Sequence, residues 1–127
     1  MKKVIKTSNA PMPIGPYNQG IITNGTLFIS GQIAINPVTN QLENKDIQTE
    51  TLRVMQNLKA VLNEAGMDFG DVVKSSIFLS DMNNFSDVNE VYGSFFDQET
   101  APARETVQVS RLPKDANVEI SMIAVKS

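Results

Sequence analysis

The 127-residue sequence contains neither cysteine nor histidine. Without cysteine there are no disulfide bonds and no thiol nucleophile, and without histidine no imidazole can activate a serine. Only carboxylates and carbonyl oxygens remain as metal ligands, so zinc and copper sites are not expected. No glycine-rich phosphate loop precedes a predicted helix. The sequence therefore predicts neither a metal nor a coenzyme.

The sequence also lacks an excess of positive charge and a long apolar run. Eleven basic residues stand against 14 acidic residues, and this net charge of −3 gives no field that attracts nucleic acid or anionic lipid. No segment approaches the ~20 apolar residues that cross a bilayer, so a cytoplasmic location is expected. With 41% hydrophobic residues, the length suits one domain, residues 1–127, around one core.

Alternating apolar residues and turn signals predict the β-strands. Asn24-Gly25 suits the positive φ angles of a type I′ turn and predicts a hairpin. A stretch with three prolines and one glycine, residues 10–16, is predicted to be a loop. The predicted strands are residues 3–6, 17–22, 26–29, 72–80, 103–110 and 118–126.

Two segments carry apolar residues at helical spacing. The first begins near Asp46, a predicted N-cap, and ends before Gly66, a predicted C′ residue. Its predicted buried stripe is Met55, Leu58, Leu62 and Ala65, with Leu52 in support. The second is predicted to run to about Gln98, with Phe85, Val88, Tyr92, Phe95 and Phe96 on one side.

The order of elements predicts an α+β fold with one mixed six-stranded sheet and both helices on the same face. One face of the 72–80 strand is predicted to carry Val73, Ser75, Ile77 and Leu79. The 118–126 strand is apolar on both faces, with Val118, Ile120, Met122 and Ala124 on one and Ile123 and Val125 on the other. Because two helices cover only one face, the other face is expected to pack against further copies of the chain.

Arg104 is the first candidate for a functional residue. Pro102 precedes it, and strand alternation places it on the same side as Thr106 and Gln108. Its guanidinium could grip a small carboxylate through two parallel hydrogen bonds, in a way that lysine cannot match. The alternative is an ordinary salt bridge at the surface or at a subunit interface.

Glu119 is the second candidate, because it interrupts a strand that is otherwise apolar. It could hold and activate a water molecule as a general base. The alternatives are a charge that discourages aggregation of the strand, or one half of an ion pair. Tyr17 and Ser30, with Gly31 beside the serine, could form hydrogen bonds to a ligand, although such residues usually serve cores and turns.

Five segments in order resemble the RidA family, also called the YjgF-type reactive intermediate (2-imino acid) deaminases. They are residues 14–17 (IGPY), 29–33 (ISGQI), 57–62 (NLKAVL), 102–104 (PAR) and 111–115 (RLPKD). The resemblance covers nearly the whole chain. It implies a chorismate-mutase-like fold of the bacillus type, assembled as a homotrimer whose sheets form a central barrel with active sites between subunits.

The resemblance also implies a function in metabolite damage control. The reaction is hydrolysis of 2-iminopropanoate and 2-iminobutanoate, or their enamines, to 2-keto acids and ammonia. Pyridoxal-phosphate-dependent dehydratases of serine and threonine supply these substrates. By analogy, Arg104 would bind the substrate carboxylate, Glu119 would activate water, Tyr17 and Ser30 would shape the pocket, and the backbone at Gly31 and Thr106 would complete the hydrogen bonding.

Two positions depart from the family pattern, since many relatives have cysteine where this chain has Thr106 and serine where it has Asn18. Three other functions remain open. The same pocket could bind 2-keto acids without catalysis, in which case Glu119 has no water to activate. RNA-directed activity is disfavoured by the net charge and by the lack of histidine. Chaperone-like binding would require the oligomer to open.

Overall fold

A computed structural model describes residues 1–126 and contains one six-stranded sheet in the order β1-β2-β3-β6-β4-β5. The β4 and β5 strands are parallel and every other neighbouring pair is antiparallel. The predicted mixed α+β sheet is confirmed. The strands are β1 (Lys3–Ile5), β2 (Gly20–Thr23), β3 (Thr26–Gln32), β4 (Val72–Leu79), β5 (Ala103–Gln108) and β6 (Val118–Val125).

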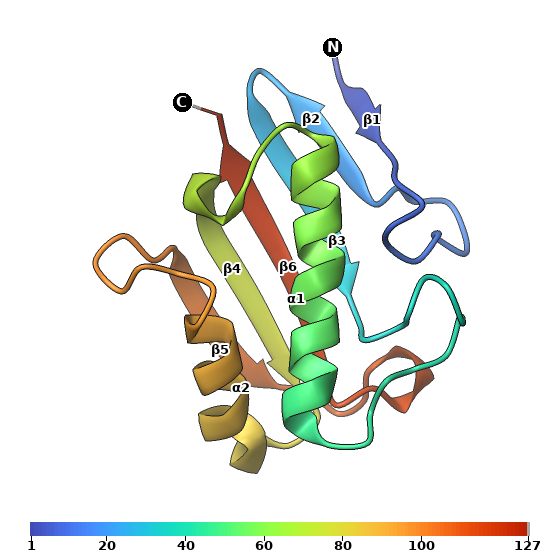
Figure 1. Ribbon diagram of the computed structural model, residues 1–127, viewed down its shortest axis with the longest axis vertical. Helices are drawn as coiled ribbons and strands as arrows, with labels where there is room; N and C mark the ends of the chain where they lie inside the picture. The colour runs from blue at the N-terminus through green and yellow to red at the C-terminus, as the bar shows by residue number, and fades with distance from the viewer. Residues whose placement is uncertain (127) are drawn as a thin grey trace.

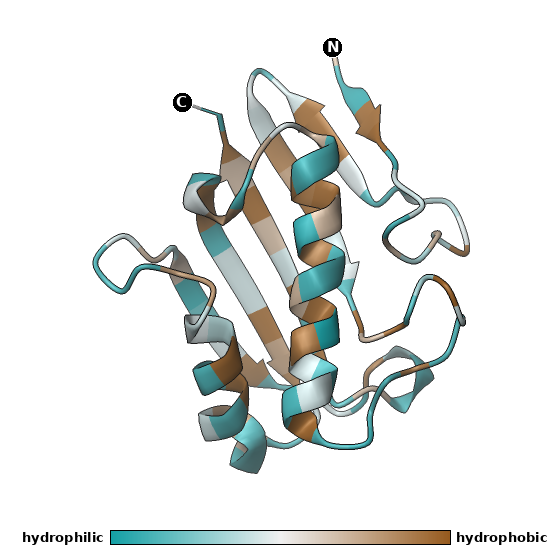
Figure 2. Cartoon of the chain, in the orientation of Figure 1, coloured by the Kyte–Doolittle hydropathy of each residue, from teal (hydrophilic) through white to brown (hydrophobic). Residues whose placement is uncertain are grey.

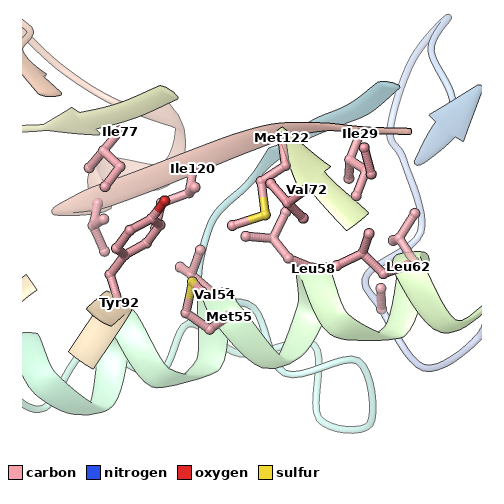
Figure 3. Packing of buried hydrophobic residues seen from close by; sticks show 14 of the residues in the cluster. Ile29, Val54, Met55, Leu58, Leu62, Val72, Ile77, Tyr92, Ile120 and Met122 are labelled. Atoms are coloured by element: carbon pink, nitrogen blue, oxygen red, sulfur yellow. The ribbon is translucent and has the colours of Figure 1, made fainter. Parts of the chain in front are cut away.

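Helices α1 (Ile47–Glu64) and α2 (Phe85–Gly93) lie side by side on one face of this sheet (Figure 1). Both helices carry brown, apolar residues and teal, hydrophilic residues in alternation along their length (Figure 2), and apolar residues such as Val54, Val61 and Val88 are buried. Side chains from α1, such as Leu58 and Leu62, meet Ile29, Val72 and Met122 of the sheet (Figure 3). The core therefore occupies the single layer between helices and sheet.

The ends of α1 agree with the sequence. The Asp46 carboxylate accepts a hydrogen bond from the Thr49 N–H at 2.7 Å, and Gly66 adopts the left-handed φ of 73° that ends the helix. Met55, Leu58 and Leu62 are buried as predicted. Leu52 was wrongly included in the predicted buried stripe, since its side chain is 41% exposed.

The predicted end of α2 is wrong. The helix stops at Gly93, so Phe95 and Phe96 follow it instead of extending its apolar side. Their rings lie 5.2 and 5.4 Å from the Phe69 ring. Phe95 and Phe96 thus pack in an aromatic cluster with Phe69 after the helix has ended.

The β2 strand begins at Gly20 and not at residue 17 as predicted. Gly15 has a φ of 117°, and the Tyr17 N–H donates to the Gly15 carbonyl at 2.9 Å, so residues 15–17 form a turn. Asn24 and Gly25 have φ angles of 50° and 78°, which confirms the predicted hairpin turn.

Val73 does not belong to the buried face of β4. A bulge lies between Val72, opposite Ala124, and Lys74, opposite Ile123. Val73 is the extra residue and is 48% exposed, whereas Val72 enters the core. The remaining predictions for this face, Ser75, Ile77 and Leu79, are confirmed as buried.

Among residues 1–126, no helix covers the second face of the sheet (Figure 1). An apolar row crosses four paired strands on this face, since Val4 pairs with Ile21, Ile21 with Phe28, and Phe28 with Ile123. The side chains of Val4 and Phe28 are each 47% exposed. Across the residues that the structure describes, no helix is long and apolar enough to span a membrane.

Candidate active site

The site begins at an irregularity in β3. Ile29 pairs with Met122 and Gln32 with Ile120, so Ser30 and Gly31 together oppose only Ser121. The Ser30 N–H donates to the Gln19 carbonyl at 2.9 Å, and the Ser30 hydroxyl donates to the Asn18 carbonyl at 2.6 Å. These bonds tie the bulge to the segment that precedes β2.

Glu119 lies directly against Gly31. A Cβ atom added to Gly31 would stand 2.6 Å from Oε2 of Glu119 and 2.8 Å from its Cδ. A glycine is therefore required for this carboxylate to occupy its place. Burial raises the pKa of Glu119 above its ordinary value of 4.5, and no group in residues 1–126 opposes that shift.

A cavity of about 540 Å³ contains Glu119 and three other predicted site residues, Tyr17, Ser30 and Gly31. Its walls are mainly apolar, with Met12, Ile14, Ile33, Ile35 and Pro113 among them. Four of the six predicted residues thus meet in one place. A carboxylate with a raised pKa in a largely apolar cavity is a candidate functional site.

Gln19 shapes one wall of this cavity. Its side chain is buried and donates to the carbonyls of Thr7, Ala10 and Pro11 at 3.0, 3.2 and 2.8 Å, while its Oε1 accepts from the Thr7 N–H at 2.7 Å. One amide thus fixes the proline-rich loop that carries Met12 and Ile14. The sequence prediction missed this residue, although a glutamine directly after the loop was a signal.

The start of β6 is held by Glu50 of α1, which is fully buried. Its carboxylate accepts from the backbone N–H of Asn117 at 2.7 Å, from the Asn117 side-chain amide at 2.9 Å, and from the Val118 N–H at 3.3 Å. Glu119 is the next residue. Glu50 therefore fixes the backbone that aims the candidate general base.

Arg104 lies elsewhere, in a second cavity of about 520 Å³ beside α2. Its Nη1 donates to Oδ1 of Asn89 at 2.7 Å. Its Cζ is 5.2 Å from the centre of the Tyr92 ring and 5.6 Å from that of Phe85. The sequence prediction placed Phe85 and Tyr92 on one side of the helix without a functional role and missed Asn89, although the three share one helical face.

Arg104 and Glu119 belong to opposite faces of the sheet. Arg104 pairs with Ser75, which is buried under the helices, whereas Glu119 pairs with Phe78, one residue before the buried Leu79. Within one chain the two candidate groups therefore do not act on the same small molecule.

Thr106 shares the helix-covered face with Arg104. Its hydroxyl oxygen is buried and lacks a hydrogen-bond partner in residues 1–126. A buried hydroxyl without a partner costs about 1–3 kcal/mol. Over the same residues, no cluster of three acidic side chains is arranged to hold a metal ion.

The fold and the two cavities define a small α+β protein that presents a carboxylate on one sheet face and an arginine on the other. The sequence matches the family model described as endoribonuclease L-PSP over residues 7–126. The chain belongs to this family, which contains the RidA and YjgF proteins, and the resemblance noted in the sequence is confirmed.

Individual relatives support this family assignment. A RutC family protein of Pyrococcus horikoshii is 51% identical, with 99% of each chain covered. The Escherichia coli protein named "putative reactive intermediate deaminase TdcF" is 46% identical and covers 100% of this chain and 99% of its own. The crystal structure of E. coli TdcF with bound serine has a TM-score of 0.92 at 44% identity, covering 98% of this chain and 99% of TdcF.

Proposed function

We propose that this protein hydrolyses small 2-imino acids, such as 2-iminopropanoate and 2-iminobutanoate, to 2-keto acids and ammonia. The observation that carries the proposal is the Glu119 carboxylate, held against Gly31 in a largely apolar cavity with its pKa raised by burial. A carboxylate of raised pKa is a better proton acceptor and accordingly suits general base catalysis near neutral pH. The relative named as a reactive intermediate deaminase supports the same reaction.

The proposed reaction needs little from the protein because a protonated imine carbon is already electrophilic. Glu119 accepts a proton from water as the water oxygen bonds to the imine carbon, and a tetrahedral amino alcohol forms. Glu119 then gives this proton to nitrogen, the hydroxyl group loses its own proton to Glu119 as the C–N bond breaks, and ammonia leaves as the keto group forms. Positioning and a matched charge supply the rate enhancement in this scheme.

Arg104 supplies the matched charge by binding the substrate carboxylate in two parallel hydrogen bonds. Tyr17 and Ser30 shape the pocket, and the backbone at Gly31 and Thr106 completes the contacts. The TdcF structure with bound serine supports a site for a small molecule that carries a carboxylate.

Because Arg104 and Glu119 occupy opposite faces of one sheet, the proposed site needs two copies of the chain. The apolar row on the uncovered face, including Phe28, offers the surface on which copies associate. We propose a homotrimer with a central barrel, as in the family, whose clefts pair the arginine cavity of one copy with the carboxylate cavity of the next.

The proposal is tested by running a threonine dehydratase reaction with semicarbazide, which traps free imine. Addition of this protein should accelerate release of 2-oxobutanoate and reduce trapped imine, and Arg104→Ala and Glu119→Gln should each abolish the effect. If the folded oligomer binds 2-oxobutanoate but changes neither quantity, the protein is a binding module and the enzymatic proposal is wrong.

The family description raises RNA cleavage as a second candidate function. The net charge of −3 and the absence of histidine weigh against it, because RNA binding usually requires a basic surface. Tight RNA binding that weakens steeply with salt, together with cleavage lost in Glu119→Gln, would favour this candidate over imine hydrolysis.

A further inference from the structure

Three side chains of α2 contact the Arg104 guanidinium. Asn89 follows Phe85 by four residues on α2 and precedes Tyr92 by three, so the three side chains share one helical face. All three contact the Arg104 guanidinium, two through their rings and Asn89 through a 2.7 Å hydrogen bond. The Tyr92 ring is fixed in turn, since its hydroxyl donates to the buried Ser75 hydroxyl at 2.9 Å.

The chemistry of the Asn89 contact is selective. A guanidinium has only donors, so Asn89 meets it with its carbonyl oxygen, a neutral acceptor. Across residues 1–126 no carboxylate lies within salt-bridge distance of Arg104, although two other arginines of the chain form such pairs. The arginine is thus held in place while its positive charge remains uncompensated.

We infer that Asn89 is a positioning residue, which holds the Arg104 guanidinium on the Tyr92 and Phe85 rings through a neutral bond and so keeps its charge available for a ligand carboxylate. This inference rests on the proposed function, in which Arg104 binds the carboxylate of the imino acid. A long side chain that is already ordered loses less freedom when the ligand binds.

Two substitutions at Asn89 distinguish a positioning role from a purely structural one. Asn89→Asp preserves the acceptor and the shape of the side chain, yet it places an anion on the guanidinium that competes with the ligand. Asn89→Ala removes the bond but leaves the charge free. If Asn89 positions a charge, Asp should be the more harmful change; if it merely supports the fold, Ala should be.

The test measures the affinity of the oligomeric protein for 2-oxobutanoate by calorimetry, which does not depend on turnover. We expect affinity to fall about 3-fold in Asn89→Ala, because the guanidinium must then be ordered as the ligand binds, and at least about 10-fold in Asn89→Asp. Gln56→Glu, the same amide-to-carboxylate change at an exposed site on α1, is the matched control and should bind like wild type.

Turnover gives a second readout. In the trapping assay both Asn89 variants should need more imine for half-maximal effect while keeping most of the rate at saturation. Wild-type affinity in both variants, or a greater loss in Ala than in Asp, would overturn the inference alone provided that Arg104→Ala abolishes binding. Unchanged affinity in Arg104→Ala would overturn the proposed carboxylate clamp and the inference with it.

Discussion

At the scale of single residues, Glu119 is placed where its charge is costly. Burial raises its pKa above 4.5, so the folded chain holds this proton more tightly than the unfolded chain does. The stabilisation from the proton bound to Glu119 is complete below about pH 4.5 and is lost as the pH rises through the raised pKa of the folded chain. At neutral pH the ionised carboxylate therefore destabilises the fold while supplying the proposed general base.

Glu119→Gln should accordingly be more stable than wild type at pH 8 while it loses about 100-fold or more in imine hydrolysis, the usual share of a general base. The difference in unfolding temperature between the two proteins should shrink as the pH falls toward 4. Scanning calorimetry from pH 4 to 8 measures this. A variant that is less stable than wild type at pH 8 would show that Glu119 has a stabilising partner instead.

At Gly31, the short distance to the Glu119 carboxylate explains why the residue is glycine. In Gly31→Ala the new methyl group would overlap Oε2 of Glu119 at 2.6 Å, so the carboxylate must move. We expect imine hydrolysis to fall by about 10-fold or more, because displacements near 1 Å in a site cost up to ~100-fold. Adding Glu119→Asp, which shortens the acid, should recover part of the loss; no recovery would mean that Gly31 acts through its backbone alone.

At the scale of elements, the tie between α1 and β6 is the contact that most directly links core and site. Glu50 accepts three hydrogen bonds, all from Asn117 and Val118, at the point where β6 begins. A buried carboxylate is tolerated here because several N–H groups surround it.

Glu50→Leu leaves these donors without an acceptor and should lower the free energy of unfolding by about 3 kcal/mol or more, at roughly 1–3 kcal/mol for each buried group. Glu50→Gln should cost less than about 1 kcal/mol, because its carbonyl can serve the two backbone N–H groups while the Asn117 amide turns to accept from its NH2. Urea denaturation compares the two. Equal losses would mean that the negative charge itself is required.

Elements governed by local chemistry were predictable from the sequence. The Asp46 cap, the Asn24-Gly25 turn and the Gly66 end of α1 each depend on a few neighbouring residues. Elements governed by tertiary pairing were not. Val73 was assigned to the wrong face because its bulge exists only against β6, and α2 was extended too far because Phe95 and Phe96 pack on Phe69.

The candidate site likewise contains residues that the sequence predicted and residues that it did not. Residue chemistry and family resemblance identified Tyr17, Ser30, Gly31 and Glu119, which the structure gathers into one cavity. Their neighbours Gln19 and Glu50 escaped notice because their role is to bind backbone from distant segments. That Arg104 lies on the opposite sheet face follows from strand register, which a single sequence does not reveal.

At the scale of the whole molecule, the main feature is the apolar sheet face that no helix of residues 1–126 covers. The row that includes Ile21, Phe28 and Ile123 is apolar, and an exposed face of this kind would otherwise promote aggregation. In the proposed trimer, association of like copies would cover this face and would also bring an arginine cavity to each carboxylate cavity.

Phe28→Asp should dissociate the oligomer, because it buries a charge without a partner in the apolar interface. The matched control is Val38→Asp, which adds the same charge at a loop residue that is 91% exposed. Light scattering should give a smaller mass for Phe28→Asp only, and imine hydrolysis should fall with it. A wild-type monomer at micromolar concentration would contradict the assembly.

The most direct test of the central claim, that each site takes Arg104 from one copy and Glu119 from another, is complementation between Arg104→Ala and Glu119→Gln. Each variant alone should be inactive. Trimers formed from an equal mixture of the two should recover about a quarter of wild-type imine hydrolysis, because each of the two positions has an even chance of holding the intact residue. No recovery, in mixed trimers prepared by a procedure that preserves wild-type activity, would contradict a site shared between copies.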